Sequence, residues 1–251
     1  MQLLLDAVSY EYSAGSGFTL GPLSFGLDTG KVTALIGSNG SGKTTLIRVL
    51  INELIGYQGT YSIDGHPARD TKGSLLATCG IGYAPEYPVL EERLTGKETM
   101  ELLRDIHQLS AGEYEEQLAE CRNALHVEEW FDNAPCSGYS QGMRKKVSLM
   151  IAFLGRPKFI IIDEPTNGLD PLATFGLKQL LSRRAGQGIG ALVSSHMLDF
   201  VERVAAEVRI LKKGTIAFAG TVAHLFEEHP GKPLDEIYYH LFMQETEPAS
   251  E

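Results

Sequence analysis

Two adjacent carboxylates after a buried strand are the residues best suited to chemistry in this sequence. In Phe159–Pro171, FIIIDEPTNGLDP, four apolar residues predict a strand, and Asp163 and Glu164 follow at its carboxyl end, where parallel α/β sheets place ligand-binding groups. The turn residues and the proline after them predict the start of a helix. One acid could hold a metal while the other activates water. Isolated runs of this type are more often strands that end in a solvated turn, so the chemical interpretation requires a phosphate site elsewhere.

A second motif supplies that phosphate site. Residues 37–44, GSNGSGKT, match the phosphate-binding pattern G-x-x-x-x-G-K-[ST]. Lys31–Ile36 before the motif predicts a strand, and Thr45–Leu54 after it has apolar residues at helical spacing. Backbone N–H groups of the loop and of the following helix would bind phosphates. We expect Lys43 to reach the β- and γ-phosphates and the Thr44 hydroxyl to ligate Mg²⁺. The predicted nucleotide site consists of Gly37, Ser38, Asn39, Gly40, Ser41, Gly42, Lys43, Thr44 and Thr45.

The composition is that of a soluble globular protein. Of the 251 residues, 43% are hydrophobic and 22% are charged. No apolar run approaches the ~18 residues of a membrane span, and the N-terminus lacks a signal-peptide layout, so we expect a protein that does not itself cross a membrane. The net charge of −10 argues against nucleic acid as a partner. The three cysteines, Cys79, Cys121 and Cys136, include no CxxC pair, which disfavours disulfides and zinc and fits a reduced, cytosolic setting.

The order of the predicted elements indicates an α/β fold. Strands are expected near the N-terminus at Gln2–Leu5, Val8–Tyr12 and Leu23–Leu27. Amphipathic spacing predicts helices at Glu98–Leu109, Glu113–Leu125 and Ser140–Leu154, in a helical segment, about 95–153, that interrupts the strands. Further strands are expected at Tyr61–Asp64, Gly80–Tyr83, Phe159–Asp163, Ala191–Ser195 and Val208–Leu211. Further helices are expected at Pro171–Ala185 and Leu198–Ala206. Alternation of strand and helix after a phosphate-binding loop predicts a mostly parallel sheet with helices on both faces.

The order of the motifs resembles that of the ATP-binding subunits of ABC transporters, over about residues 3–220. Tyr139–Lys146, YSQGMRKK, is similar to the signature motif of that family, L-S-G-G-Q. Ser140, Gln141, Gly142 and Met143 take the signature positions, and Gln141 and Met143 depart from the strict pattern. The resemblance implies that the Ser140 hydroxyl and the Gly142 N–H contact the γ-phosphate of ATP bound to a second subunit.

The resemblance also implies roles for the residues around the acidic strand end. Asp163 is similar to the acid that holds Mg²⁺ through water, and Glu164 to the general base that polarises the attacking water. Asp170 corresponds to the D-loop aspartate, which faces the second chain. His196 corresponds to the switch histidine near the γ-phosphate. Glu164 and His196 are therefore the predicted catalytic residues.

Glu86 is the main departure from the family pattern. The family generally has glutamine at this place, where it contacts Mg²⁺ and senses the γ-phosphate. A carboxylate is still an oxygen ligand for Mg²⁺, so the predicted metal ligands are Thr44, Glu86 and Asp163. The carboxylate also adds negative charge beside the triphosphate and cannot donate a hydrogen bond. Glutamate here is not unusual among relatives that drive export, so we expect a functional but tuned site.

The resemblance further implies the organisation of the chain. It predicts a phosphate-binding-loop (P-loop) NTPase core with a mostly parallel sheet, an N-terminal antiparallel β subdomain and an inserted helical subdomain. The ABC ATPase domain is expected at 1–220, and a short C-terminal helical extension with a polar tail at 221–251. Tyr12 is similar to the aromatic residue that stacks on adenine, with Tyr10 as the rival, and either tyrosine could equally be an ordinary aromatic residue of a strand.

Two kinds of partner follow from the resemblance. Two chains, identical or paralogous, would close head-to-tail over two ATP molecules. A separate polytopic membrane subunit would hold the protein at the cytoplasmic face of the membrane, with Glu86–Thr95 either receiving a short helix from that subunit or serving as an ordinary connector. The segment Pro233–Phe242 is similar to the terminal helix of export ATPases, and the longer regulatory domain usual in importers is absent, which favours export.

Other functions remain as alternatives. A soluble ABC ATPase without a transport role, such as an iron–sulfur cluster assembly ATPase, is the main one. A catalytically silent nucleotide-binding regulator is disfavoured by the presence of Lys43, Asp163, Glu164 and His196. The transported substrate is not predicted, because in this family the membrane subunit selects it.

Overall fold

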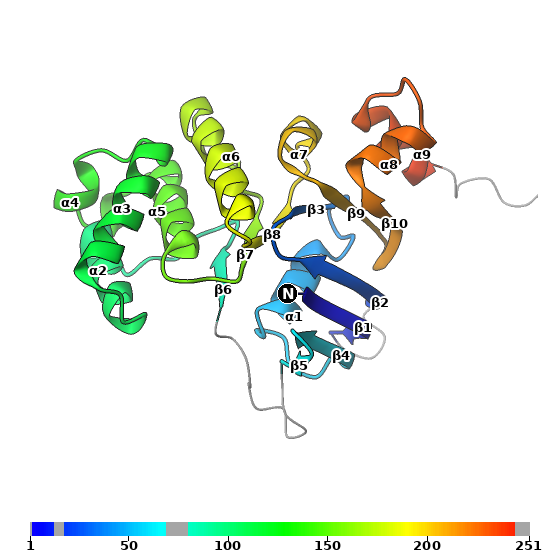
Figure 1. Cartoon of the computed structure of the whole chain (residues 1–251), viewed down its shortest axis with the longest axis horizontal. Coiled ribbons are helices and arrows are strands. Elements are labelled where there is room, and N and C mark those ends of the chain that lie inside the picture. The colour runs from blue at the N-terminus through cyan, green and yellow to red at the C-terminus, as the bar shows by residue number, and fades with distance from the viewer. Residues whose placement is uncertain (1, 13–17, 69–79, 244–251) are drawn as a thin grey trace, which may run out of the picture.

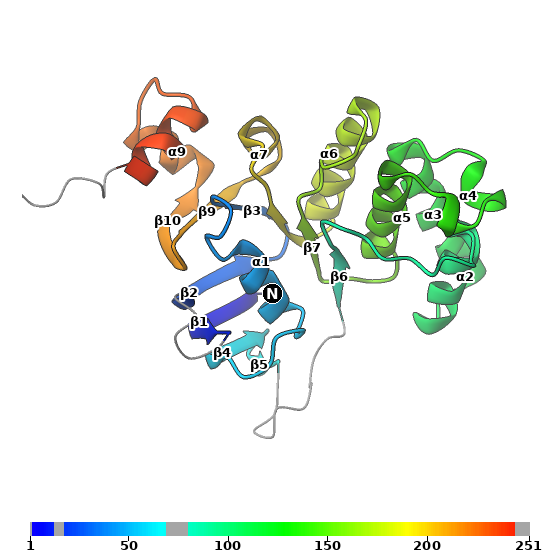
Figure 2. The same ribbon diagram turned by 180° about the vertical axis from the view of Figure 1, so that it is seen from behind.

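The chain folds around two β-sheets (Figure 1). The computed structural model describes residues 2–12, 18–68 and 80–243, with side chains described as far as Leu241. Cys79 and the polar tail expected at 245–251 lie outside the described residues. The helices α2 to α5 gather at one end of the molecule and α8 and α9 at the other, with the sheets between them (Figures 1 and 2).

The larger sheet is mostly parallel and carries the predicted chemical motifs at one edge. Its strands lie in the order β10-β9-β3-β8-β7-β6, and only the β10–β9 pair is antiparallel. Their bounds are β3 (Val32–Ile36), β6 (Ile81–Ala84), β7 (Phe159–Asp163), β8 (Gly190–Ser194), β9 (Glu207–Lys212) and β10 (Thr215–Thr221). Every residue of β3, β7 and β8 is buried. Strands covered on both faces have apolar residues at successive positions, which explains the uninterrupted hydrophobic runs in the sequence.

The smaller sheet is antiparallel and lies against helix α1 (Lys43–Leu50). Its order is β2-β1-β4-β5, with bounds β1 (Gln2–Glu11), β2 (Thr19–Asp28), β4 (Gln58–Ile63) and β5 (His66–Pro67). Leu46 and Leu50 of α1 share one hydrophobic cluster with residues of β1 and β2 and with Ile161 and Leu192 of the larger sheet. Helix α1 therefore joins the two sheets and fixes the loop that precedes it.

One prediction for this region is wrong. The sequence predicted separate strands at Gln2–Leu5 and Val8–Tyr12, whereas β1 is a single strand with a β-bulge. Ala7 has a φ of 51°, and the pairing with β2 shifts between Leu5 and Val8. The bulge inserts an extra residue, so Leu5 and Val8, three positions apart, are both buried. In the sequence, this loss of period-2 alternation resembles a turn between strands.

The helical segment consists of α2 (Gly96–Ile106), α3 (Ala111–Leu125), α4 (Trp130–Asn133), a 3-10 turn (Cys136–Gly138) and α5 (Gln141–Phe153). Thr95 with Glu98, and Ser110 with Glu113, form capping boxes that begin α2 and α3. Helix α5 packs closely on β6, where a Cβ atom at Gly82 would lie 1.9 Å from the carbonyl oxygen of Ala152. This contact fixes the signature helix against the larger sheet.

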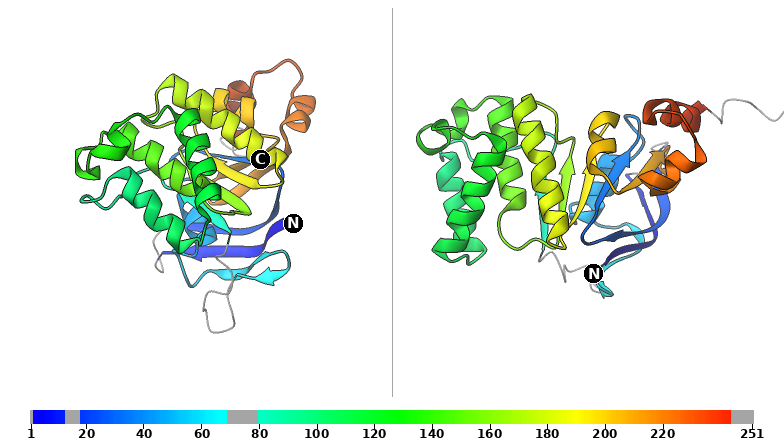
Figure 3. Two further views of the ribbon diagram at one scale, coloured as in Figure 1. Left: turned by 60° about the vertical axis from the view of Figure 1, so that its left-hand side comes forward. Right: turned by 45° about the horizontal axis from the view of Figure 1, so that its top comes forward.

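The rest of the chain covers the larger sheet with α6 (Pro171–Gly186), α7 (Leu198–Val204), α8 (Val222–Glu228) and α9 (Leu234–Met243). Figure 3 shows α6 and α7 over the sheet and α8 and α9 beyond β10. Leu225, Leu234 and Ile237 form a cluster with Val208 and Ile210 of β9, which anchors the C-terminal helices. The sequence analysis missed β10 and α8, because β10 has no buried residue and α8 is only two turns long.

The architecture confirms the predicted fold class, an α/β fold with a mostly parallel sheet and an N-terminal antiparallel sheet. Among the described residues, no helix combines the length and apolar character needed to cross a membrane.

Candidate functional site

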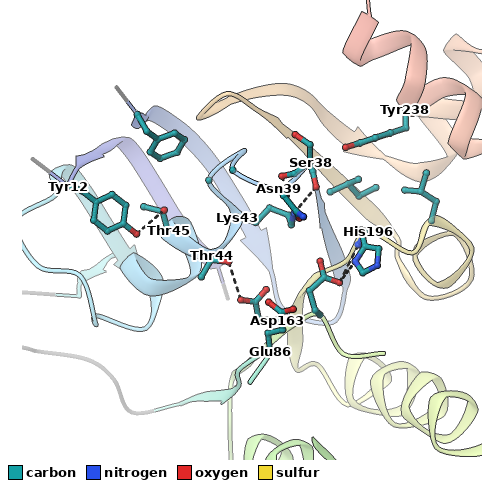
Figure 4. Close-up of a pocket in the computed structure, with 17 residues that line it drawn as sticks. Tyr12, Ser38, Asn39, Lys43, Thr44, Thr45, Glu86, Asp163, His196 and Tyr238 are labelled. Atoms are coloured by element: carbon teal, nitrogen blue, oxygen red, sulfur yellow. Dashed lines mark hydrogen bonds and ion pairs between the residues drawn. The ribbon is translucent and has the colours of Figure 1, made fainter. Parts of the chain in front are cut away.

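A cavity of about 850 Å³ opens at the edge of the larger sheet where β3 and β7 end (Figure 4). Its wall includes residues 37–40 and 42–45 of the predicted phosphate-binding loop. The same wall carries Tyr12, Glu86, Asp163, Glu164 and His196. The fold thus gathers these predicted residues into one cavity, although Tyr12 and His196 are 184 positions apart in the sequence.

The loop after β3 brings the N-terminus of α1 to the cavity. Gly42 is the N-cap of α1, has a φ of 108°, and makes no side-chain capping hydrogen bond. The first N–H groups of a helix have no partner within the helix, so they remain available for an anion. A Cβ at Gly42 would lie 2.9 Å from Leu20 and 3.0 Å from Phe18, so the loop requires glycine on both conformational and steric grounds.

Lys43 is held inside the loop. Its side chain is buried, and Nζ donates to the carbonyl oxygen of Gly37 at 2.6 Å. Burial lowers the pKa of Lys43, whereas the charges of Glu164, Asp163 and Glu86 act in the opposite direction. A triphosphate would bring negative charge to this ammonium group and thereby favour its charged form.

Ser41 is the loop residue that does not line the cavity. It is buried, and its Oγ is among the buried polar atoms of the described residues that lack a hydrogen-bond partner. A Cβ at Gly37 would lie 2.3 Å from this oxygen. Its place is therefore beneath the loop, where it packs against Gly37.

Thr44 and Asp163 form the best candidate pair for a divalent cation. The Thr44 hydroxyl donates to Oδ2 of Asp163 at 3.4 Å, and the hydroxyl of Ser194 donates to Oδ1. No group of three or more His, Cys, Asp or Glu side chains among the described residues could hold a metal by itself. Mg²⁺ at nucleotide sites uses one or two protein oxygens together with phosphates and water, so this sparse donor set fits magnesium carried by a nucleotide.

Glu164 and His196 are joined directly. Oε2 of Glu164 lies 2.8 Å from Nδ1 of His196, and the Glu164 side chain is buried while that of His196 is exposed. Glu164 has a φ of 45°, a conformation unusual for a residue with a side chain. Its N–H group donates to both the carbonyl and the hydroxyl oxygen of Ser194, each at 3.1 Å. The backbone therefore turns sharply after Asp163, so the two consecutive carboxylates serve different partners.

Three polar residues that the sequence analysis left without a role support this centre. Ser194 pairs with Asp163 in the register of β7 and β8, and its hydroxyl donates to Oδ1 of Asp163 and accepts from the N–H of Glu164. Asn167 donates from Nδ2 to Oε1 of Glu86 at 3.1 Å. The completely buried Lys145 donates to the carbonyl oxygens of Pro85 and Asp163. These residues come from separate elements, so only the sheet register and helix packing reveal them.

Tyr12 and Tyr10, the two candidates for the contact with adenine, differ in their position relative to the cavity. Tyr12 lines the cavity, and its hydroxyl lies 3.1 Å from Oγ1 of Thr45. Tyr10 packs edge-on against Tyr12, with ring centroids 5.1 Å apart, and contacts the hydrophobic core. The position of Tyr12 favours it over Tyr10. The cavity wall also includes Phe18 and, from α9, Tyr238, which the motifs did not indicate.

The signature residues lie at a different cavity, of about 260 Å³. Ser140, Gly142 and Met143 line it, and Gln141 is exposed beside them. Ser140 caps α5 by accepting a hydrogen bond from the N–H of Met143 at 3.2 Å. A Cβ at Gly142 would lie 2.5 Å from the carbonyl oxygen of Gly168, so glycine is needed where α5 meets the loop before α6.

Asp170 lines the same second cavity and already has partners within the chain. Oδ1 accepts a hydrogen bond from the N–H of Ala173 at 2.8 Å and thereby caps α6, and Oδ2 lies 2.9 Å from Nζ of Lys146. The hydrogen bond from Lys146 lowers the pKa of Asp170. The carboxylate therefore ties the start of α6 to the signature helix.

A parallel sheet with an anion-binding loop, a buried lysine and two carboxylates at one edge defines a nucleoside triphosphatase of the P-loop class. Residues 20–167 match the model of the protein family described as ABC transporter. The ABC-type transporter ATP-binding protein EcsA of Bacillus subtilis is 34% identical over 92% of this chain and 94% of its own length. The Nod factor export ATP-binding protein I of Mesorhizobium japonicum is 28% identical over 93% of this chain and 68% of its own length.

Solved structures agree with these relatives. An ATP-binding subunit of an ABC transporter, 34% identical, superposes with a TM-score of 0.86 over 96% of this chain and 99% of its own. A dimeric ATP-binding cassette in a post-hydrolysis state with ADP and Pi, 22% identical, has a TM-score of 0.76 over 88% of this chain and 98% of its own and shares the fold. This chain belongs to the ABC transporter family as an ATP-binding subunit. It is an ATPase that binds ATP, its substrate, together with Mg²⁺.

Proposed function

We propose that this protein is the motor subunit of a transporter and hydrolyses MgATP at the interface of a head-to-tail dimer. The observation that carries the proposal is the separation of the two half-sites. The phosphate-binding loop and both acids line one cavity, whereas Ser140 and Gly142 line another. A second copy, or a paralogue, would bring its signature helix to the first cavity, so that each ATP lies between two chains.

The residues of the first cavity would divide the chemistry among them. Lys43 and the N-terminal N–H groups of α1 would bind the phosphates, since donors aimed at developing charge stabilise the transition state. Thr44 and Asp163 would hold Mg²⁺. Glu164 would accept the proton of the attacking water, and His196, bonded to Glu164, would keep that carboxylate oriented toward the γ-phosphate.

Closure by a second chain would complete the site. Ser140 is exposed at the start of α5, and the N-terminus of that helix would favour an anion beside it. The γ-phosphate would then be the ligand shared by both chains, and hydrolysis would remove it and release the dimer. The dimeric cassette that shares this fold supports such an arrangement.

A separate membrane subunit would use this cycle, and we propose that the direction is export. Tyr87 and Val89, which follow Glu86, are 70% and 93% exposed. Two exposed apolar side chains beside a predicted metal ligand suit contact with a short helix of a membrane partner. Export is supported by the glutamate at position 86, which is not unusual among relatives that drive export, and by the similarity to the Nod factor export protein. The chain would then lie at the cytoplasmic face of the membrane, without nucleic acid as a partner.

Glu164→Gln tests the motor mechanism. The substitution removes the general base but keeps the side-chain volume, so we expect ATP hydrolysis to fall by at least about 100-fold and an ATP-bound dimer to accumulate. Steady-state phosphate release and light scattering after size exclusion, with and without MgATP, measure the two effects. A Glu164→Gln chain that stays monomeric with MgATP and retains full turnover would contradict both the role of Glu164 and the dimer.

Isolation from mild detergent extracts tests the transport role separately. Recovery of the chain with a polytopic membrane protein is the expected result. Recovery only with soluble scaffold proteins would support the alternative of an iron–sulfur assembly ATPase and contradict the proposed transport function.

A further inference from the structure

Lys145 is a buried cation at the ends of β6 and β7, and the catalytic scheme above assigns it no role. It lies on α5, five residues after Ser140, and its exposed fraction is 0%. Lysine is almost never fully buried without compensating partners, because the ammonium group loses its hydration. A completely buried lysine so close to the nucleotide cavity therefore requires an explanation beyond packing.

The partners of Lys145 are backbone carbonyls of two strand ends. Nζ donates to the carbonyl oxygen of Pro85 at 2.8 Å and to that of Asp163 at 2.7 Å. Pro85 follows β6 and precedes Glu86, and Asp163 ends β7. One side chain of the signature helix therefore joins the backbone of two of the three segments that present predicted metal ligands, those of Glu86 and Asp163.

The surroundings of Lys145 are negatively charged. The carboxylates of Asp163, Glu86 and Glu164 all raise the pKa of its ammonium group, against the larger, opposing effect of burial. These are the three carboxylates of the nucleotide cavity. Glu86 carries a charge that the usual glutamine of the family lacks, and a cation behind the strand ends opposes that extra charge in a region of low dielectric constant.

We propose that Lys145 is a positioning residue for ATP hydrolysis. It sets the positions of Asp163 and Glu86 through their backbone, and its charge compensates the carboxylate of Glu86. Because it lies on α5, it also connects the signature helix to the catalytic edge of its own chain. The inference rests on the predicted metal-binding roles of Asp163 and Glu86 and does not require the dimer.

A double-substitution cycle of Lys145→Gln and Glu86→Gln tests this proposal. We expect Lys145→Gln alone to lower kcat for MgATP hydrolysis by at least about 10-fold, as loss of precise placement does, with a smaller change in KM. In the Glu86→Gln background the same substitution should lower kcat by no more than about 3-fold, since the charge to be compensated is gone. Lys145→Arg, which keeps the charge, should retain more activity than Lys145→Gln.

Arg209 provides a matched control for the loss of a buried cation. It is 8% exposed, and its guanidinium group bonds to Glu207 and to the carbonyl oxygen of Gly26, away from the cavity. Arg209→Gln should lower the melting temperature without changing kcat of the folded fraction or its dependence on Glu86.

Two outcomes would overturn the proposal: a wild-type kcat for Lys145→Gln, or an equal loss of kcat from Lys145→Gln with and without the Glu86→Gln substitution. If Lys145→Gln does not fold, the Lys145→Arg chain and the double-substituted chain still decide the question, because the double substitution should fold and hydrolyse ATP. Failure of Glu164→Gln to dimerise would refute the proposed dimer while leaving the Lys145–Glu86 coupling measurable.

Discussion

The two cavities differ in how much of their chemistry a single chain completes. At the phosphate-binding loop, Lys43, Asp163 and Glu164 are buried and already bonded to partners within the chain. At the signature motif, Ser140 is exposed at the end of a smaller cavity. The first cavity therefore holds buried, bonded groups, whereas the second exposes its signature serine. Under the proposed mechanism, one chain would bind ATP and closure by a second chain would be needed for fast hydrolysis.

Among the substitutions that test the difference between the two cavities, removal of the ammonium group of Lys43 should have the largest effect, on MgATP binding. We expect Lys43→Ala to weaken MgATP binding by roughly 2–3 kcal/mol, about 30- to 150-fold, because a charge-assisted hydrogen bond to phosphate is lost. Titration with a fluorescent ATP analogue measures the affinity. Lys97→Ala on the exposed face of α2 is the control and should bind as the wild type does. Equal binding by Lys43→Ala and wild type would show that the loop is not the phosphate site.

A methyl group at Gly142 should affect the second half-site alone. Because its Cβ would lie 2.5 Å from the carbonyl oxygen of Gly168, Gly142→Ala must displace the loop before α6. We expect hydrolysis to fall by about 10-fold or more, as oxyanion donors are displaced, while MgATP affinity of the isolated chain stays within about 2-fold of wild type. Gly138→Ala is a matched control, since its Cβ would meet no atom within 4 Å. Loss of affinity in the isolated Gly142→Ala chain would remove the distinction between the two cavities.

Substitution of Asp170 should have the smallest effect, and this effect should be on the stability of the folded chain. Asp170→Ala removes the cap of α6 and half of the ion pair with Lys146. Caps are worth about 1 kcal/mol, and the ion pair, in which the Asp170 side chain is 49% exposed, adds less, so the free energy of unfolding should fall by about 1 kcal/mol in urea titrations. Asp170→Asn can retain the cap and should lose less.

The stabilisation of the fold by Asp170 should decrease as the pH falls. Since the hydrogen bond from Lys146 lowers the pKa of Asp170 in the folded state, the ionised carboxylate stabilises the fold above the unfolded-state pKa of about 4. This contribution is lost as the pH falls through the lower, folded-state pKa. The stability difference between wild type and Asp170→Ala should therefore narrow below about pH 4. A difference that stays constant from pH 7 to pH 3 would contradict the ionic part of this interaction.

Much of the fold could be predicted because its signals are local. The buried strand before Asp163 and the loop before Lys43 each combine a hydrophobic run with residues of special backbone geometry, and the structure places both at the same sheet edge. The bulge at Ala7 could not be predicted, because a single residue of left-handed conformation can interrupt a strand or end it. Strand β10 also escaped prediction, since none of its residues is fully buried and only Ile216 and Phe218 pack against the hydrophobic clusters.

The supporting residues of the site could not be predicted for a different reason. Ser194 and Asn167 act on carboxylates 31 and 81 positions away, respectively, and Lys145 acts on the backbone of β6 and β7. Serine, asparagine and lysine are common on protein surfaces, so their residue types alone do not indicate a role.

The order of the amino acids alone establishes which groups are available for catalysis: a glycine-rich loop with Lys43, two adjacent carboxylates, and a signature segment that begins at Ser140. Each motif can be identified in the sequence because a predicted strand ends just before it or a predicted helix begins just after it. The folded chain was needed to show which groups share a cavity, that Asp170 bonds within its own chain, and that Lys145 lies beneath the carboxylates. These relations depend on sheet order and helix packing, which arise from contacts between distant segments and leave no periodic signal in the sequence.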